Sequence, residues 1–262
     1  MTAGKSGSDL GVRSAVGLVL IAVALLALWA GPVGLWLLIA TAAMLMLAEW
    51  CDLSGADARG RRAALFAACV PLAILAPPPV AAGPGSLALG LGVAAALVTA
   101  GITGRVRLGL GVLYVVLPAI ALVFIRAEAD GLLLCLWVLA GVWATDIGAY
   151  FAGRTIGGPK LAPAISPNKT WAGLGGGVIA ALAFGLILWR FLELPLALAL
   201  LSPVLAVVAQ AGDLFESALK RRAGVKDSGR ILPGHGGVMD RLDGLVTAAP
   251  VAAILILVQR ML

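Results

Sequence analysis

The chain has 262 residues, of which 61% are hydrophobic and 12% charged, with a formal net charge of +6 and a mean hydropathy of +1.06. Apolar runs that recur along the whole chain exclude a soluble globular domain and predict an all-α, polytopic integral membrane protein. The positive charge fits a membrane face beside anionic lipid, and we expect no nucleic-acid partner.

Nine apolar segments are long enough to be membrane spans, and they are separated by basic segments or by turns rich in Gly and Pro. They comprise residues 14–30, 32–50, 63–79, 87–103, 108–125, 131–150, 172–189, 194–213 and 244–260. The first segment lacks a clear small-x-small cleavage site and is followed directly by a second span. It is therefore predicted to be a retained helix rather than a signal peptide.

The distribution of Lys and Arg predicts the orientation of these spans. With the N-terminus in the cytoplasm, only Arg126, Arg190 and Arg260 of the 19 basic residues fall on the outer side. The other sixteen fall inside, which is the cytoplasmic bias of membrane proteins. We therefore expect a multi-pass protein of the inner cell membrane whose two long polar segments, 151–171 and 214–243, face the cytoplasm.

The residues that most often bind soft metals are scarce. Cys51, Cys69 and Cys135 are scattered in or beside apolar segments without C-x-x-C spacing. They are predicted to be packing residues, and they indicate neither a disulfide framework nor a thiolate zinc site. Because His235 is the only histidine in the sequence, a bound metal would have mainly oxygen ligands, which favours a hard ion such as Mg2+.

Acidic residues of the second half reach one depth, the inner edge of the predicted hydrocarbon core. Asp146 lies about 15 residues into its span, or roughly 22 Å along it. Asp213 ends the eighth predicted span, and Asp240 and Asp243 precede the ninth. A common depth allows a shared site without proving it, and a solvated acidic edge is the alternative for Asp146.

The eighth span continues in helical spacing beyond its apolar part. Asp213, Glu216, Ser217 and Lys220 recur at i, i+3, i+4 and i+7, so we expect them on one helical face. The alternative is a helix that frays into the cytosol and carries only a Glu216–Lys220 pair.

The stretch that follows combines glycines, acids and cations. Glycines around His235 in PGHGG permit tight turns and close approach to a ligand, and the backbone N–H groups of such turns bind anions. A structural hydrogen-bonding role is the alternative for His235. Asp240 and Asp243 share one helical face and suit Mg2+ bound to phosphate oxygens. Basic residues nearby either hold phosphate or face anionic lipid; they are Lys220, Arg221, Arg222, Lys226 and Arg230. Together these features predict a polyphosphate site.

At these positions the sequence resembles the phosphatidate cytidylyltransferases (CDP-diacylglycerol synthases). Their signature is S-x-x-K-R, four residues, K-D, then Pro-Gly-His-Gly-Gly and D-R-x-D. It is matched here by Ser217, Lys220, Arg221, Lys226, Asp227, Pro233, Gly234, His235, Gly236, Gly237, Asp240, Arg241 and Asp243. Residues 143–173 are similar to the family's other polar segment, with Ala172 where many members carry Glu. The resemblance is vague before residue 105.

The resemblance implies a reaction of CTP with phosphatidate that gives CDP-diacylglycerol and pyrophosphate and requires Mg2+, with a second cation left open. The residues implied to be catalytic are Asp213, Lys220, Lys226, Asp227, His235 and Asp240. Those implied to bind substrate are Ser166, Lys169, Thr170, Ser217, Arg221 and Arg241. Of these, Ser166, Lys169 and Thr170 lie at the start of the seventh predicted span, where a helix N-terminus can bind phosphate. Those implied to bind metal are Asp146, Asp213, Asp240 and Asp243.

We therefore expect an N-terminal scaffold region, 1–130, and a catalytic region, 131–262, with membrane lipid as a partner and a homodimer left open. A transporter is the main alternative, but it would place charges near the midplane within repeats or broken helices. Another lipid enzyme, a CDP-alcohol phosphotransferase or a prenol kinase, is closer; the former would show a D-G-x-x-A-R pattern. A non-catalytic scaffold has no need for these charges.

Overall fold

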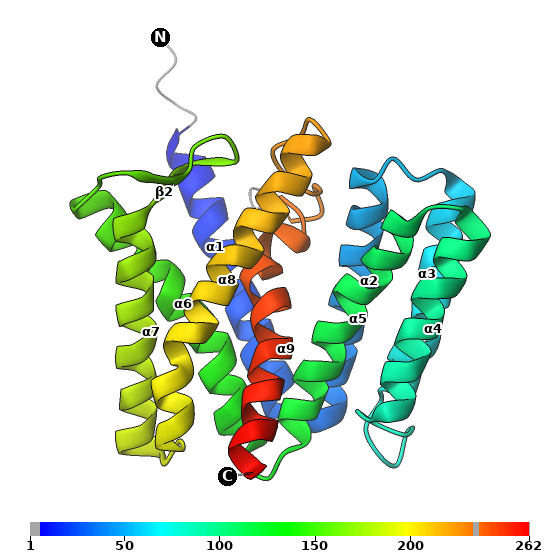
Figure 1. Cartoon of the computed structure of the whole chain (residues 1–262), viewed down its shortest axis with the longest axis horizontal. Helices are drawn as coiled ribbons and strands as arrows, with labels where there is room; N and C mark the ends of the chain where they lie inside the picture. The colour runs from blue at the N-terminus through cyan, green and yellow to red at the C-terminus, as the bar shows by residue number, and fades with distance from the viewer. Residues whose placement is uncertain (1–5, 233–235, 262) are drawn as a thin grey trace. The chain divides into compact units, whose positions relative to one another are not determined.

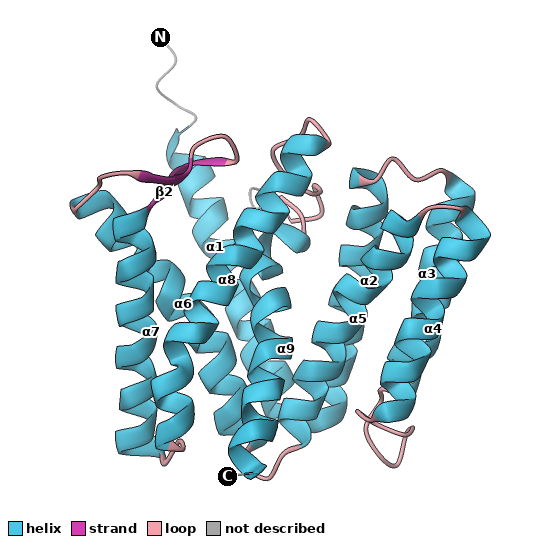
Figure 2. Cartoon of the chain, in the orientation of Figure 1, coloured by secondary structure: helices cyan, strands magenta, loops and turns pink. Residues whose placement is uncertain are grey.

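The computed structural model describes residues 6–232 and 236–261, which form nine α-helices and one two-stranded sheet (Figures 1 and 2). The helices are α1 Ser6–Trp29, α2 Gly31–Leu53, α3 Ala58–Ile74, α4 Ser86–Thr103, α5 Val106–Ala127, α6 Gly131–Thr155, α7 Trp171–Leu192, α8 Leu196–Arg222 and α9 Met239–Met261. The strands are β1 Lys160–Ala162 and β2 Ser166–Thr170. The predicted all-α membrane class is confirmed, with the short hairpin as its one departure among the described residues.

Among the described helices, seven are long and apolar enough to cross a membrane: α2, α4, α5, α6, α7, α8 and α9. The third predicted span is displaced, because α3 has 17 residues and ends at Ile74 instead of residue 79. Asp57 caps its start, where the side chain accepts the Gly60 N–H at 3.1 Å. Three consecutive prolines, residues 77–79, prevent the helix from extending to residue 79.

The chain divides into two compact units. One comprises residues 1–123 and 225–242, and the other comprises residues 124–224 and 243–262. The division in the first half lies close to the boundary predicted at residue 130, but residues 225–242 group with the N-terminal part. The assignment of scaffold and catalytic roles to the two predicted regions stays a prediction.

In the first unit, α3 packs along α4, and α2 packs along α1 and α3. Trp50 links α2 to α5, because its indole N–H donates to the Arg107 carbonyl at 2.9 Å and its ring lies 4.9 Å from the Tyr114 ring. Asp52 is paired with Arg61 at 2.7 Å on the surface of this unit. The Trp50 contacts hold the end of α2 against α5, whose Leu108 and Val112 are buried.

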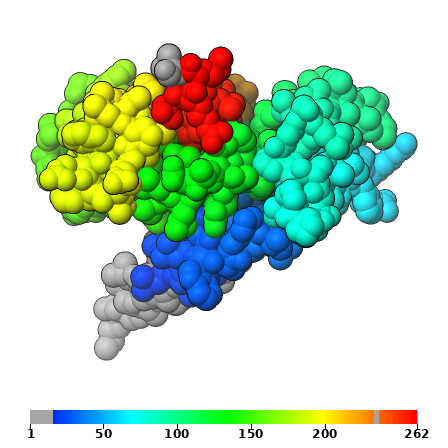
Figure 3. Space-filling model, turned by 90° about the horizontal axis from the view of Figure 1, so that it is seen from below, coloured from blue at the N-terminus to red at the C-terminus, as the bar shows by residue number. Residues whose placement is uncertain are grey.

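In the second unit, α7 packs closely against α6 and also against α8 (Figures 1 and 3). Small residues allow the α6–α7 contact: an added Cβ at Gly148 would lie 2.6 Å from the Gly176 carbonyl oxygen. The α9 side chain of Thr247 donates to the Val208 carbonyl at 3.0 Å, which ties α9 to α8. Large apolar side chains such as Ile179 and Phe191 are exposed on the outer side of α7, as expected for a surface that contacts lipid.

The hairpin of β1 and β2 leads directly into α7. Its antiparallel register places Lys160 opposite Thr170 and Ala162 opposite Ser166. Thr170 is the N-cap of α7, and its hydroxyl oxygen accepts the Gly173 N–H at 3.0 Å. The hairpin therefore holds the polar segment before α7 against the start of that helix.

Candidate functional site

Helix α8 brings the predicted acidic and basic residues onto one continuous helical face. It extends nine residues past Asp213 to Arg222, so Asp213 lies inside the helix and not at its end. Ser217 donates to Asp213 at 3.3 Å, and Lys220 pairs with Glu216 at 3.0 Å. Glu216 is fully buried and Lys220 largely so, and the alternative of a fraying, solvated end is therefore wrong.

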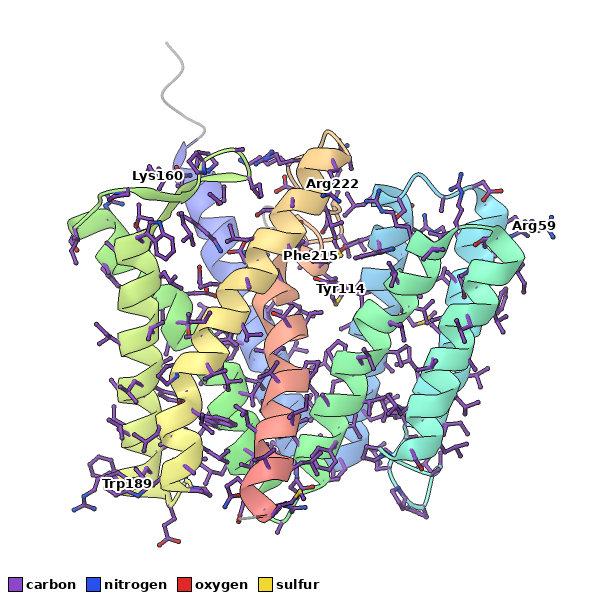
Figure 4. The ribbon with its side chains drawn as sticks, in the orientation of Figure 1. Arg59, Tyr114, Lys160, Trp189, Phe215 and Arg222 are labelled. Atoms are coloured by element: carbon purple, nitrogen blue, oxygen red, sulfur yellow. The ribbon has the colours of Figure 1, made fainter. Side chains whose placement is uncertain are left out.

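A pocket of about 580 Å³ opens in the second unit between α6, β2, α7 and α8. Its lining combines carboxylates, cations, amides and hydroxyls. These polar residues are Asp146, Tyr150, Arg154, Asn168, Lys169, Thr170, Gln210 and Asp213. Further cations, Lys160 of β1 and Arg222 of α8, lie at the same end of this unit, whereas Trp189 lies at the opposite end (Figure 4).

The pocket brings together Lys169 and Asp213, which were predicted from separate motifs. The Lys169 ammonium lies 2.5 Å from the Asp213 carboxylate, and both side chains are partly exposed toward the pocket. The Gln210 amide donates to Asp146 at 3.3 Å on the same side. The cations of the pocket can bind an anionic phosphate, and the carboxylates beside them keep the net charge of the empty site close to zero.

Asp243 of α9 approaches this group from a third helix. An added Cβ at Gly212, the neighbour of Asp213, would lie 2.6 Å from the Asp243 carbonyl oxygen, and the Asp243 carboxylate accepts the Gly244 N–H at 2.8 Å. Helices α6, α8 and α9 thus each contribute one of the predicted metal-binding aspartates to the second unit.

The donor chemistry of these three aspartates fits Mg2+, because hard divalent cations prefer carboxylate oxygens. The Lys169 ammonium lies against Asp213 and supplies a positive charge where a cation would bind. Within residues 6–232 and 236–261, however, no three acidic, His or Cys side chains converge as a metal-ligand cluster. The metal stays a prediction that rests on donor type and charge.

Asp240, the fourth predicted metal ligand, has partners in its own loop, in the first unit. One of its carboxylate oxygens accepts the Ser228 N–H at 2.8 Å, the Ser228 hydroxyl at 2.9 Å and the Gly237 N–H at 2.8 Å. Asp240 is buried, whereas Lys226 and Asp227 beside Ser228 are exposed. Asp240 therefore closes the loop that carries the signature residues.

The remaining predicted residues fall in different places. Ser166 lies in β2 and is not among the pocket-lining residues, while the Arg221 guanidinium lies near the Ile165 carbonyl at 3.4 Å. Arg241 is exposed at the start of α9. The predictions for His235, and for the neighbouring residues 233–234, fall outside the described residues.

One residue that sequence reasoning missed is Glu49 of α2. It is 3% exposed and accepts hydrogen bonds from Ser228, Val238 and Met239. These donors lie in or next to the segment that carries the family signature, whose described residues are 226–232 and 236–240 and which we call the signature loop. The signal was present, because a lone acid inside an apolar span indicates a functional or structural partner.

Seven apolar helices among the described residues, and a pocket whose lining combines carboxylates with a lysine and an arginine, define an integral membrane protein with a charge-dense polar site. A model of the cytidylyltransferase family matches residues 11–259, and the chain belongs to this family. It is 41% identical over 250 residues to a phosphatidate cytidylyltransferase of Brucella suis biovar 1, covering 92% of this chain and 91% of that protein. Proteins of the same name from Staphylococcus haemolyticus and Staphylococcus saprophyticus are 45% and 46% identical over about half of each chain. The family resemblance inferred from the motifs is confirmed, and it extends well before residue 105.

Proposed function

We propose that this chain transfers a cytidylyl group from CTP to phosphatidate and produces CDP-diacylglycerol and pyrophosphate, which feeds phospholipid biosynthesis. The observation that carries the proposal is the 41% identity, over nearly the full length of both chains, to a relative named phosphatidate cytidylyltransferase. The pocket supports it physically, because its lining includes two cations, Lys169 and Arg154, that can bind anionic phosphates.

In the proposed reaction, a phosphate oxygen of phosphatidate attacks the α-phosphorus of CTP. The bond from that phosphorus to the oxygen bridging to the β-phosphate breaks, and pyrophosphate leaves with the electron pair. The nucleophile is already an anion, so the main obstacle is repulsion between two negatively charged substrates. Lys169 and Arg154 reduce this repulsion and orient the phosphates.

The residues proposed to hold Mg2+ are Asp146, Asp213 and Asp243 of the second unit; Asp240, predicted with them, instead accepts hydrogen bonds within its own loop in the first unit. A bound Mg2+ supplies charge neutralisation at the phosphate oxygens. Lys169 can exchange its Asp213 partner for a substrate phosphate, since both groups face the same pocket. Arg221 and Arg222 extend the positive charge along α8, whereas the charge of Lys220 is paired with the buried Glu216.

We place the reaction at the cytoplasmic edge of the inner membrane. The charge distribution supports this location, because sixteen of the 19 basic residues fall on the side predicted to be cytoplasmic. An active site at that edge meets soluble CTP and the headgroup of phosphatidate at one level.

Phosphatidate-dependent release of pyrophosphate from CTP by the purified protein in detergent or vesicles tests the proposal. We expect release with CTP, little with ATP at the same concentration, and none without phosphatidate. Equal release with ATP, or release that does not depend on phosphatidate, contradicts it. A transporter or a scaffold would release no pyrophosphate under any of these conditions.

A further inference from the structure

The carboxylate of Glu49 is buried at the end of α2 with its hydrogen bonds supplied by a segment far away in sequence. One oxygen accepts the Val238 N–H and the other the Met239 N–H, both at 2.8 Å, and the single proton of the Ser228 hydroxyl, 3.0 Å from the second oxygen, is shared between Glu49 and Asp240. Burying a carboxylate is costly unless such charge-assisted hydrogen bonds replace water. The three donors are thus the main reason that Glu49 is stable there.

Two glycines of the signature loop enclose this carboxylate. An added Cβ at Gly229 would lie 2.7 Å from the nearer Glu49 oxygen, and one at Gly237 would meet both Glu49 and the Ser228 hydroxyl. Such distances are too short for a real side chain, so a larger residue at Gly229 must shift Glu49, and one at Gly237 must shift both Ser228 and Glu49. These glycines make room for an internal acid.

Three consecutive backbone N–H groups, those of Gly237, Val238 and Met239, donate to carboxylates of the protein itself. The Gly237 N–H donates to Asp240, and the next two N–H groups donate to Glu49. The Ser228 hydroxyl lies between the two carboxylates. Glu49 and Asp240 together therefore determine where α9 begins and where the chain near residue 228 lies.

We infer that Glu49 is a positioning residue for cytidylyl transfer, acting through the loop that carries Lys226, Asp227 and Asp240. It does not need to touch substrate: its three hydrogen bonds hold the segment in which those residues lie. The inference rests on the proposed function of that segment. A displacement of about 1 Å in a reacting group can cost about a hundredfold in rate, so loosening this support should be visible in turnover.

The first test replaces Glu49 by Gln, which keeps the size of the side chain. The Gln amide N–H2 then replaces one carboxylate oxygen and faces the backbone N–H groups and the hydroxyl that donate to Glu49. We expect kcat per folded protein to fall at least tenfold, with KM for CTP changed less than threefold. Asp52→Asn is the matched control, because Asp52 is an exposed acid one helical turn further along α2; it should keep wild-type kinetics. Wild-type kcat in Glu49→Gln, or a lower yield of folded protein with wild-type kcat, overturns the inference.

The second test is a double-mutant cycle that uses the enclosing glycine. Gly229→Ala should lower kcat at least fivefold by displacing Glu49, whereas Gly101→Ala, with no heavy atom within 4 Å of the added Cβ, should not. In Glu49→Ala the space is open, so adding Gly229→Ala should cause no further loss. If the fold-losses in kcat of the two single variants multiply in the double variant, the inference is overturned. Gly229→Ala also tests it on its own if the Glu49 variants fail to fold.

A readout that needs no activity separates this inference from the proposed function. Arg230 is an exposed trypsin site in the loop that Glu49 holds. Cleavage after Arg230 should be at least fivefold faster in Glu49→Gln than in the wild type or in Asp52→Asn. If the wild type releases no pyrophosphate yet the loop loosens, the proposed function fails and the support by Glu49 stands. Unchanged cleavage overturns the support itself.

Discussion

Replacing Asp213 by Asn removes one negative charge from the pocket while keeping the size of the side chain. Asp213 contacts Lys169 at 2.5 Å and Ser217 at 3.3 Å, so it organises two of the residues predicted to bind substrate. At an effective dielectric constant of about 20, a unit charge about 4 Å away contributes about 4 kcal/mol. Because the Asp213 side chain is 31% exposed, solvent screening reduces that value. We expect at least a hundredfold loss of turnover, about 3 kcal/mol of transition-state stabilisation.

The assay is pyrophosphate release with CTP and phosphatidate saturating, measured over a Mg2+ titration. The variant should need more Mg2+ and should reach a lower maximum rate. Its stability should fall by no more than about 3 kcal/mol, because the Lys169 ammonium is buried and loses its charged partner but can still donate to the Asn amide oxygen. Asp52→Asn, which breaks the exposed pair with Arg61, should change neither quantity. A wild-type rate with wild-type Mg2+ dependence in Asp213→Asn would refute the metal assignment.

Three further predictions concern Lys169, Ala172 and the orientation of the chain in the membrane. Lys169→Ala should raise KM for a phosphate-bearing substrate more than it alters Mg2+ dependence; the reverse pattern would make Lys169 a partner of the metal site alone. Ala172→Glu should change activity less than tenfold, because a carboxylate in the first turn of α7 is compatible with the helix N-terminus; a hundredfold change would contradict this. Single cysteines at Val80 and Ala164, both exposed in loops, should label from opposite membrane faces in a background without Cys69, and labelling from one face would refute the predicted topology.

Apolar runs predict all nine helices of the described chain, because a membrane span needs a long uninterrupted apolar stretch. The displaced third span shows the limit of that signal. Arg59, Arg61 and Arg62 lower the hydropathy of a segment that is nevertheless the first turn of α3, while the prolines after Ile74 are apolar but end it. The hairpin was missed because neither of its strands alternates polar and apolar residues in the way that predicts a half-buried strand.

The candidate site was predictable where it depends on local spacing, and less so where it depends on packing. Helical spacing placed Asp213, Ser217 and Lys220 on one face of α8, and the structure has them there. Depth along a span says nothing of the direction in which a side chain points. Asp240 therefore could not be distinguished from Asp243, although its carboxylate binds its own loop. Glu49 was missed because its contact with Ser228 spans 179 positions in the sequence.

The glycine contact between α6 and α7 limits how this protein can be stabilised for work in detergent. Gly148 and Gly176 lie where the two helices nearly touch, one turn from the pocket lining, and a methyl group there would push the helices apart. Gly141 and Gly175 are different, because an added methyl group at either position meets no atom within 4 Å. Alanine at these two sites should add about 0.5–1 kcal/mol each, since glycine weakens a helix interior by that amount. Thermostabilising variants are therefore to be sought on the outward faces of this helix pair, where a gain in rigidity leaves the width of the pocket unchanged.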